Sequence, residues 1–209
     1  MLSREENELL TRTGPGTPMG RLVRRYWIPV LPSERLPRPD GPPLRVTLLS
    51  EKLVAFRDSN GQAHVLSDTC AHRGGALGLG KIKGNSIACP YHGWEFGGDG
   101  RCTRIPSLGD DAKLPARAKV DTYPVQEKYG LIFAFLGDLP ETERPPLYDI
   151  EEYGTPQWRA QHFVFDVKAY YERSIENGLD PIHNEFVHQA QGQPSLSPEQ
   201  QRKIGRAHV

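Results

Sequence analysis

Apolar and polar positions alternate along several short segments in the first two thirds of the chain, and β-branched residues are frequent in them. Such alternation is typical of strands that bury one face. The strand-like runs are residues 44–50, 52–57, 63–67, 120–126 and 131–137. Asp58-Ser59-Asn60-Gly61 and Lys128-Tyr129-Gly130 interrupt these runs with residues that favour hairpin turns. We therefore predict that residues 1–138 form a small, mainly antiparallel β domain.

Two helices are predicted outside these strands. Ser3 and Glu6 fit a capping box at the start of a short helix, which Gly14-Pro15-Gly16 ends. Far along the chain, Asp166 is placed to cap a second helix that stops near Gly178. The apolar face of that helix comprises Val167, Tyr170, Tyr171 and Ile175.

A predicted linker follows the β domain. Residues 139–157 contain four prolines and no apolar period, which is typical of a connection between domains. Beyond it, residues 159–167 alternate like a strand. Residues 158–203 are therefore predicted to begin a second domain.

Composition narrows the class of protein. The 209 residues carry 26 basic and 26 acidic side chains, which argues against nucleic acid or an anionic membrane as the main partner. No apolar run approaches the ~20 residues of a membrane span, and the acidic N-terminus is unlike a signal peptide. Three cysteines are too few for a disulfide framework. We therefore expect a cytoplasmic protein whose thiols are free for metal binding.

Four side chains suited to metal binding occur in two short, glycine-rich segments. Cys70 and His72 form C-x-H, and after a sixteen-residue gap Cys89 and His92 form C-x-x-H. Two thiolates and two imidazoles are good ligands for zinc or for iron in an iron–sulfur cluster. Each segment supplies one Cys and one His. This arrangement suits a two-iron cluster in which each loop gives its Cys to one iron and its His to the other. A structural zinc site is the alternative. Cys102 lies outside both segments and is predicted to be a small buried hydrophobe.

The segments CAHRGG and CPYHGWEF resemble the Rieske [2Fe–2S] motif, in which two His replace two Cys on one iron. Rieske proteins of respiratory complexes carry an extra Cys in each loop and a Ser after the second His. Gly75, Tyr91 and Trp94 stand at the corresponding positions here. The missing hydroxyl implies a reduction potential at the low end of the Rieske range, as in oxygenases.

A second candidate constellation lies near the end of the chain, at Asn177, Asp180, His183 and His188. A simple alternative is a helix start, because Asp180 and Pro181 suit the cap and the first helical position. Five residues turn an ideal helix by about 500°, so the two His would point about 140° apart. Both can bind one metal only if the helix ends or bends between them.

D-x-x-H-x-x-x-x-H after a Rieske motif and a linker resembles the mononuclear iron site of the Rieske non-haem iron aromatic ring-hydroxylating oxygenases. The large, or alpha, subunits of the phthalate-dioxygenase-like branch are the nearest group. The resemblance implies that His183 and His188 bind Fe(II). It also implies that Asp180 carries electrons from the Rieske histidine of a neighbouring subunit, and it matches Asn177 only loosely to an Asn near the iron. His64 and His162 are predicted to be structural or surface residues.

The resemblance also implies an incomplete catalytic domain. In this family that domain is an α+β helix-grip fold, and a third, carboxylate ligand of the iron follows far downstream. No acidic residue after His188 is a convincing match, so we expect a C-terminally truncated chain. Residues 204–209, IGRAHV, match the translation of a common sequencing adapter and are predicted to be a non-native tail.

The implied function is that of the oxygenase component in a multi-protein system. Electrons from NADH pass through a flavin and iron–sulfur reductase, directly or by way of a ferredoxin, to the [2Fe–2S] cluster and then to the mononuclear Fe(II). O₂ then hydroxylates or O-demethylates a small aromatic substrate. The resemblance implies a homotrimer at full length. A Rieske ferredoxin without oxygen chemistry is the alternative, and residues 158–188 discriminate the two because ferredoxins of this type end after the β domain.

Overall fold

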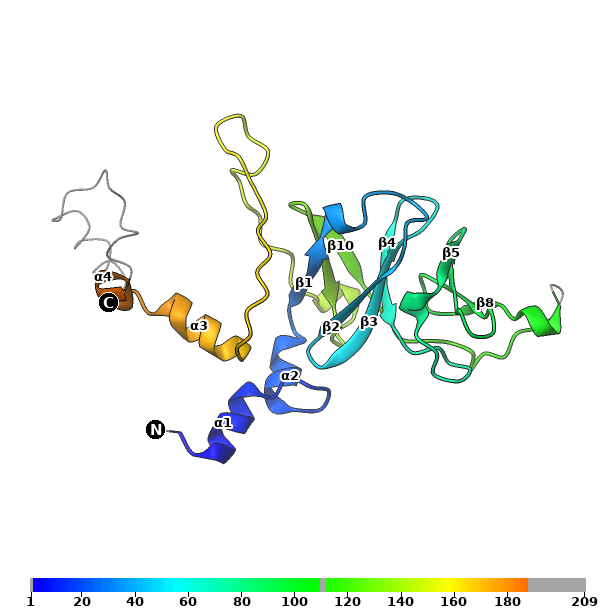
Figure 1. The fold of residues 1–209 in the computed structure, drawn as a ribbon, viewed down its shortest axis with the longest axis horizontal. Coiled ribbons are helices and arrows are strands. Elements are labelled where there is room, and N and C mark those ends of the chain that lie inside the picture. The colour runs from blue at the N-terminus through cyan, green and yellow to red at the C-terminus, as the bar shows by residue number, and fades with distance from the viewer. Residues whose placement is uncertain (1, 110–111, 188–209) are drawn as a thin grey trace. The chain divides into compact units, whose positions relative to one another are not determined.

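The computed structural model describes residues 2–109 and 112–187, which divide into two compact units, one up to His162 and one from Phe163 onward. The first unit contains three antiparallel sheets (Figure 1). The first sheet has the order β1 (Trp27–Pro32), β11 (Leu131–Phe135), β10 (Val125–Lys128). The second has the order β2 (Leu44–Leu48), β3 (Glu51–Arg57), β4 (Ala63–Ser67), β9 (Thr122–Tyr123). The third has the order β5 (Lys81–Lys83), β6 (Ser86–Ala88), β7 (Glu95–Gly97), β8 (Cys102–Arg104).

These sheets confirm the prediction of a mainly β first domain, with each predicted strand run between residues 44 and 137 contributing to one of them. In the described part of the chain, three 3₁₀ turns connect strands and a fourth follows β11. They are η1 (Ser33–Arg35), η2 (Leu77–Leu79), η3 (Pro106–Leu108) and η4 (Glu141–Glu143).

The central strand β3 of the second sheet is buried on both faces. Along β3, Leu53 and Ala55 belong to one apolar core, and Val54 and Phe56 belong to another. Because successive side chains of a strand point to opposite faces, this single strand supports both cores. The first core includes side chains of β1 and β11, whereas the second includes side chains of β6, β7 and β8 and all three cysteines. The cysteine loops therefore pack against the second sheet.

The predicted hairpin turn between β3 and β4 is stabilised by one carboxylate. Asp58 is buried, and its Oδ1 accepts hydrogen bonds from the backbone N–H groups of Asn60 and Gln62, each at 2.9 Å. The His64 ring lies 3.0 Å from Asp58 Oδ2, and Gly61 supplies the positive φ of 82° that the turn requires. Burial alone raises the pKa of Asp58, but the hydrogen bonds from His64, Gln62 and Asn60 hold its pKa below the usual value.

The N-terminal segment forms two short helices. The capping box predicted at Ser3 and Glu6 is present at the start of α1 (Arg4–Thr11). A second helix, α2 (Pro18–Val23), which the sequence pattern did not predict, is capped by the Thr17 hydroxyl. Arg24 ties this segment to the second sheet through an ion pair with Glu51 and a 3.1 Å hydrogen bond to the Leu49 carbonyl.

Residues 139–157, the predicted linker, make several contacts with the sheets of the first unit. The Trp27 indole N–H donates to the Pro145 carbonyl at 2.8 Å. The Tyr129 hydroxyl donates to Asp149 Oδ1 at 2.8 Å and accepts the Ile150 N–H at 2.8 Å. These bonds fix the segment to β1 and to the β10–β11 turn. The domain boundaries proposed from the sequence stay predictions.

The second unit contains α3 (Tyr171–Leu179) and α4 (His183–Val187), and at and after its start two local predictions were wrong and one alternative was misplaced. Residues 159–167 pair with no strand in the described part of the chain, so they do not form the predicted strand. Asp166 does not cap the helix, because a tight turn with an Ala169 N–H to Val167 carbonyl bond delays its start to Tyr171. Pro181 is not the first helical residue, since α4 begins two residues later.

Membrane-spanning helices were also sought among residues 2–109 and 112–187. None of the helices there combines the length and the apolar character needed to cross a bilayer.

We expect Asp58→Ala to destabilise the folded chain by about 2–3 kcal/mol, because two backbone N–H groups and an imidazole lose a shared acceptor. Asp58→Asn keeps an acceptor oxygen and should cost less. Exposed Asp121→Ala is the control, with an expected change within about 0.5 kcal/mol. The measurement is urea unfolding of the cluster-loaded protein at pH 7. Equal losses for Asp58→Ala and Asp121→Ala would contradict the assigned role of the turn.

Candidate metal centre

The first candidate loop follows β4 and is closed by two backbone hydrogen bonds. The Cys70 N–H donates to the Gly75 carbonyl at 2.9 Å, and the Gly74 N–H donates to the Cys70 carbonyl at 2.9 Å. Gly74 adopts a φ of 70°, which is open to glycine at little cost. The loop therefore reverses direction within six residues and brings His72 to its tip.

The second loop, between β6 and β7, repeats this geometry. The Cys89 N–H donates to the Trp94 carbonyl at 2.8 Å, and the Gly93 N–H donates to the Cys89 carbonyl at 3.0 Å. Gly93 also has a φ of 70°. In both loops the glycine with positive φ stands four residues after the cysteine. The two loops are thus equivalent turns, although their histidines stand two and three residues after the cysteine.

The two thiols lie at the dry side of the loops. Cys70 is 3% exposed and Cys89 is 4% exposed, and both belong to the core that the second and third sheets share. The two thiols are hydrogen-bonded to each other, and burial raises the pKa of Cys70 to about 11. A Cβ atom at Gly75 would lie 3.2 Å from Cys89 Sγ, so glycine lets the first loop pass close to the second thiol.

The two imidazoles lie at the opposite, exposed side of the loops. Their ring centroids are 4.5 Å apart, and the Trp94 ring stacks on His72 at 4.6 Å with an interplanar angle of 1°. Local desolvation and the neighbouring charges of His92 and Arg73 lower the pKa of His72. A lowered pKa favours the neutral ring, which is the form that binds metals.

These four side chains fit a two-iron cluster. Thiol meets thiol and imidazole meets imidazole, which is the pairing required when one iron takes two Cys and the other takes two His. Among residues 2–109 and 112–187, no three His, Cys, Asp or Glu side chains gather around one point as ligands of a single ion. Loading the cluster must displace the thiol protons, because iron binds the thiolate.

Comparison with known proteins agrees with this geometry. The family model of the Rieske [2Fe-2S] domain matches residues 26–124. The chain carries a Rieske domain. The oxygenase subunit of 3-chlorobenzoate-3,4-dioxygenase from Comamonas testosteroni is 36% identical over 187 residues, covering 88% of this chain and 42% of that protein. The oxygenase subunit of 5,5'-dehydrodivanillate O-demethylase from Sphingobium sp. is 34% identical, covering 90% and 44%.

Solved structures show the same relationship. Dicamba monooxygenase bound to dicamba matches with a TM-score of 0.70 at 31% identity, over 80% of this chain and 49% of that one. The chain is therefore a relative of Rieske oxygenase subunits, and it spans about half the length of the relatives it matches.

Asp68 supports the Rieske domain's first loop, a role that the sequence pattern did not indicate. It is 3% exposed, two residues before Cys70, and its Oδ1 accepts the Gly78 N–H at 2.7 Å. Its Oδ2 accepts a 2.7 Å bond from Arg45 Nε. An acidic residue directly after a strand and two residues before Cys70 was the available signal.

The other sequence candidates lie in the second unit. Asn177 lies within α3, and Asp180 is the C-cap of that helix. Asp180 Oδ1 accepts the Ile182 N–H at 2.9 Å, and its Oδ2 lies 3.6 Å from His183 Nδ1. Asp180 and His183 are therefore brought together. His188 lies outside the described residues, and the mononuclear iron site stays a prediction.

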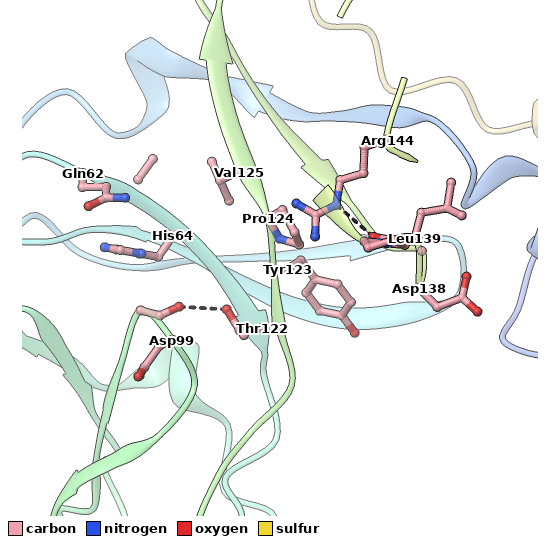
Figure 2. A pocket seen from close by; sticks show the side chains of 14 residues that line it. Gln62, His64, Asp99, Thr122, Tyr123, Pro124, Val125, Asp138, Leu139 and Arg144 are labelled. Carbon is pink, nitrogen blue, oxygen red and sulfur yellow. Dashed lines mark hydrogen bonds between the residues drawn. The ribbon is translucent and has the colours of Figure 1, made fainter. Parts of the chain in front are cut away.

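Cys102 and His64 have the structural roles predicted for them. Cys102 is buried beside β7 and donates its S–H to the Arg104 carbonyl at 3.4 Å. A cavity of ≈ 750 Å³ lies beside β4 and β9, and Figure 2 shows His64 and Arg144 on its walls. His64 there is bonded to Asp58, and none of the four Rieske-loop Cys and His residues lines the cavity.

We expect Gly75→Ala to weaken cluster retention by about tenfold, because the added methyl presses on Cys89 Sγ, which cannot move away once it binds iron. Gly14→Ala is the matched control, since its Cβ meets only ordinary contacts at 3.7 Å. Iron and acid-labile sulfide are measured after purification and during chelator challenge. Equal retention in both variants would show that the close approach at Gly75 is not needed.

Proposed function

We propose that the chain is part of the oxygenase component of a Rieske non-haem iron oxygenase system. The carrying observation is the convergence of two buried thiols and two exposed imidazoles on two equivalent loops within residues 26–124. In this proposal Cys70 and Cys89 bind one iron, and His72 and His92 bind the other. The bound cluster supplies one-electron transfer.

The surrounding residues prepare this site in distinct ways. Asp68 and Arg45 fix the first loop, so that Cys70 is held in one position. Trp94 stacks on His72 and fixes the orientation of its ring. The apolar core around Phe56 and Phe96 keeps water from the thiol side. Water is therefore excluded from the side where the thiolates would bind iron, while the imidazole edges remain open to a partner.

The relatives support the finer proposal. Their names include a dioxygenase, an O-demethylase and a monooxygenase. We propose that NADH, through a separate reductase, is the electron source, and that O₂ and a small aromatic molecule are the substrates. His183 and His188 would hold the mononuclear iron, with Asp180 orienting a ligand imidazole. A trimer at full length and a cytoplasmic location are part of the same proposal.

A Rieske ferredoxin without oxygen chemistry is the second candidate. The segment after residue 157 argues against it. A match that covers 88% of this 209-residue chain necessarily extends far beyond residue 124 and into the second unit, where the dioxygenase subunit remains alignable. An electron carrier that ends after its β domain would not show this extended likeness.

The cluster proposal predicts that anaerobically purified protein is red-brown, holds about two irons and two sulfides, and gives a Rieske EPR signal when reduced. Cys89→Ser should abolish the signal, because one iron loses a thiolate. Cys102→Ser should retain it, since that buried thiol donates to the Arg104 carbonyl and lies outside both ligand loops. A colourless protein loaded with zinc would contradict the proposal.

The role of Asp180 is tested in the protein at the full length of its relatives. Asp180→Asn removes the charge beside His183 but keeps the shape of the side chain. Product formation should fall by at least about tenfold, while reduction of the cluster by the reductase stays normal. Asp166→Asn, at an exposed acidic residue of the same unit, is the control. Turnover of Asp180→Asn at the wild-type rate would rule out this role.

A further inference from the structure

Three carboxylates are buried in the described part of the chain, and two of them stand beside the Rieske loops. They are Asp58, Asp68 and Glu95, which are 3%, 3% and 8% exposed. Asp68 stands two residues before Cys70, and Glu95 stands three residues after His92. A buried carboxylate needs cations and hydrogen-bond donors to offset its desolvation. The partners of Asp68 and Glu95 therefore determine how much negative charge remains beside the cluster site.

Glu95 is balanced by two cations. Lys83 Nζ lies 3.1 Å from its Oε1, and an Arg104 nitrogen lies 3.5 Å from the same oxygen. The second loop therefore has no excess of negative charge at Glu95.

Asp68 is balanced less completely. Its Oδ1 accepts the Gly78 N–H and its Oδ2 accepts Arg45 Nε–H, both at 2.7 Å. Among residues 2–109 and 112–187, Arg45 is the cation that forms an ion pair with it. The Arg45 side chain is 47% exposed, whereas that of Asp68 is 3% exposed. Solvent screens an exposed charge more than a buried one, so the anion is only partly cancelled by its partner.

The backbone holds this carboxylate at the edge of the core that contains the cysteines. The Leu77 N–H donates to the Asp68 carbonyl at 2.9 Å, and Leu77 packs in the same core as Cys70. A Cβ atom at Gly78 would lie 2.2 Å from Arg45 Cγ, so only glycine lets the arginine cross to the carboxylate. The pair is thus built into the first loop and is not an incidental surface contact.

We propose that Asp68 and Arg45 set the reduction potential of the Rieske cluster in opposite directions, the carboxylate lowering it and the guanidinium raising it. This inference rests on the proposed function, since it assumes a cluster bound at Cys70. Reduction adds one electron, and so one negative charge, at a site that lies two residues, at most about 7 Å of backbone, from Asp68. A buried anion there makes this addition less favourable.

The consequence is functional, because a lower potential makes the reduced cluster a stronger electron donor to the next acceptor. Asp68 and Arg45 act on the cluster through their charges and are not among its ligands. A purely structural role would give a different result, since the loss of either partner breaks the same ion pair and would disturb the loop in the same way.

The experiment is a mediated redox titration of the 209-residue chain at pH 7 and low salt. Dithionite is the reductant and is oxidised as the cluster takes up one electron, and the reduced fraction is read from the Rieske EPR signal. Asp68→Asn keeps an acceptor for the Gly78 N–H but removes the charge. At the wild-type midpoint, its ratio of reduced to oxidised cluster should rise about tenfold, which is about 59 mV for a one-electron couple. Coulomb's law gives this order of magnitude for about 10 Å and an effective dielectric constant of about 20.

Arg45→Gln should shift the ratio the other way. It leaves Asp68 without its cation, so the ratio should fall about threefold, and the effect is smaller because Arg45 is half-exposed. Arg45→Lys keeps the positive charge and should stay within about twofold of wild type. If Asp68→Asn fails to retain the cluster, the comparison of Arg45→Gln with Arg45→Lys still decides the question.

Asp58→Asn is the matched control, because Asp58 is buried to the same 3% at the other end of β4. Asp58 precedes the turn into that strand and Asp68 follows its five residues, about 17 Å of strand. The ratio for Asp58→Asn should change less than about twofold. Shifts of Asp68→Asn and Arg45→Gln in the same direction would overturn the inference, as would a shift of Asp68→Asn no larger than that of the control.

The EPR signal of the wild-type protein separates the two proposals. Its absence contradicts the proposed function and the inference with it. A normal signal combined with unchanged ratios in the Asp68 and Arg45 variants contradicts the inference alone. A normal signal, opposite shifts of the two partners and recovery in Arg45→Lys together support both.

Discussion

A two-iron site of this kind requires thiols that are dry and imidazoles that are open to solvent, only a few residues apart. The repeated turn meets this requirement. In each loop the cysteine N–H and C=O are both bonded within the loop, and a glycine with φ of 70° stands four residues after the cysteine. The backbone of Cys70 and Cys89 is therefore fixed by hydrogen bonds within each loop. The thiol faces the core, and the reversed chain carries the histidine outward.

This geometry depends in turn on β3, which is buried on both faces. Val54 and Phe56 pack in the core that contains the cysteines, while Leu53 and Ala55 pack on the opposite side. A polar substitution on either face would disturb a whole layer, and the core that holds the cysteines is shared between this sheet and the third sheet. Asp68 and Arg45 also tie the first Rieske loop to the second sheet.

The features that sequence predicted well were local ones. Asp58 and Gly61 determine their hairpin through bonds within a few residues, and the spacing of Cys and His identifies the ligand set wherever the sheets lie. The wrong predictions concerned segments in which two local structures compete. Asp166 has the chemistry of a cap, but a turn at Val167 is formed instead. Long-range hydrogen bonds such as that from Trp27 to Pro145 give no signal in the hydrophobic periodicity of the sequence. The sequence therefore did not predict that the linker is bound to the sheets.

The second unit shows why its site was harder to predict than the Rieske site. No residue of α3 is buried among the described residues, and Phe163, Tyr170 and Ile175 are exposed apolar side chains. A helix of nine residues is only marginally stable in water unless its apolar face is packed. Asp180 Oδ2 lies 3.6 Å from His183 Nδ1, but no buried side chain of α3 supports this pair from the preceding helix. The Rieske loops differ because the bonds and the core that orient their ligands all lie within residues 26–124.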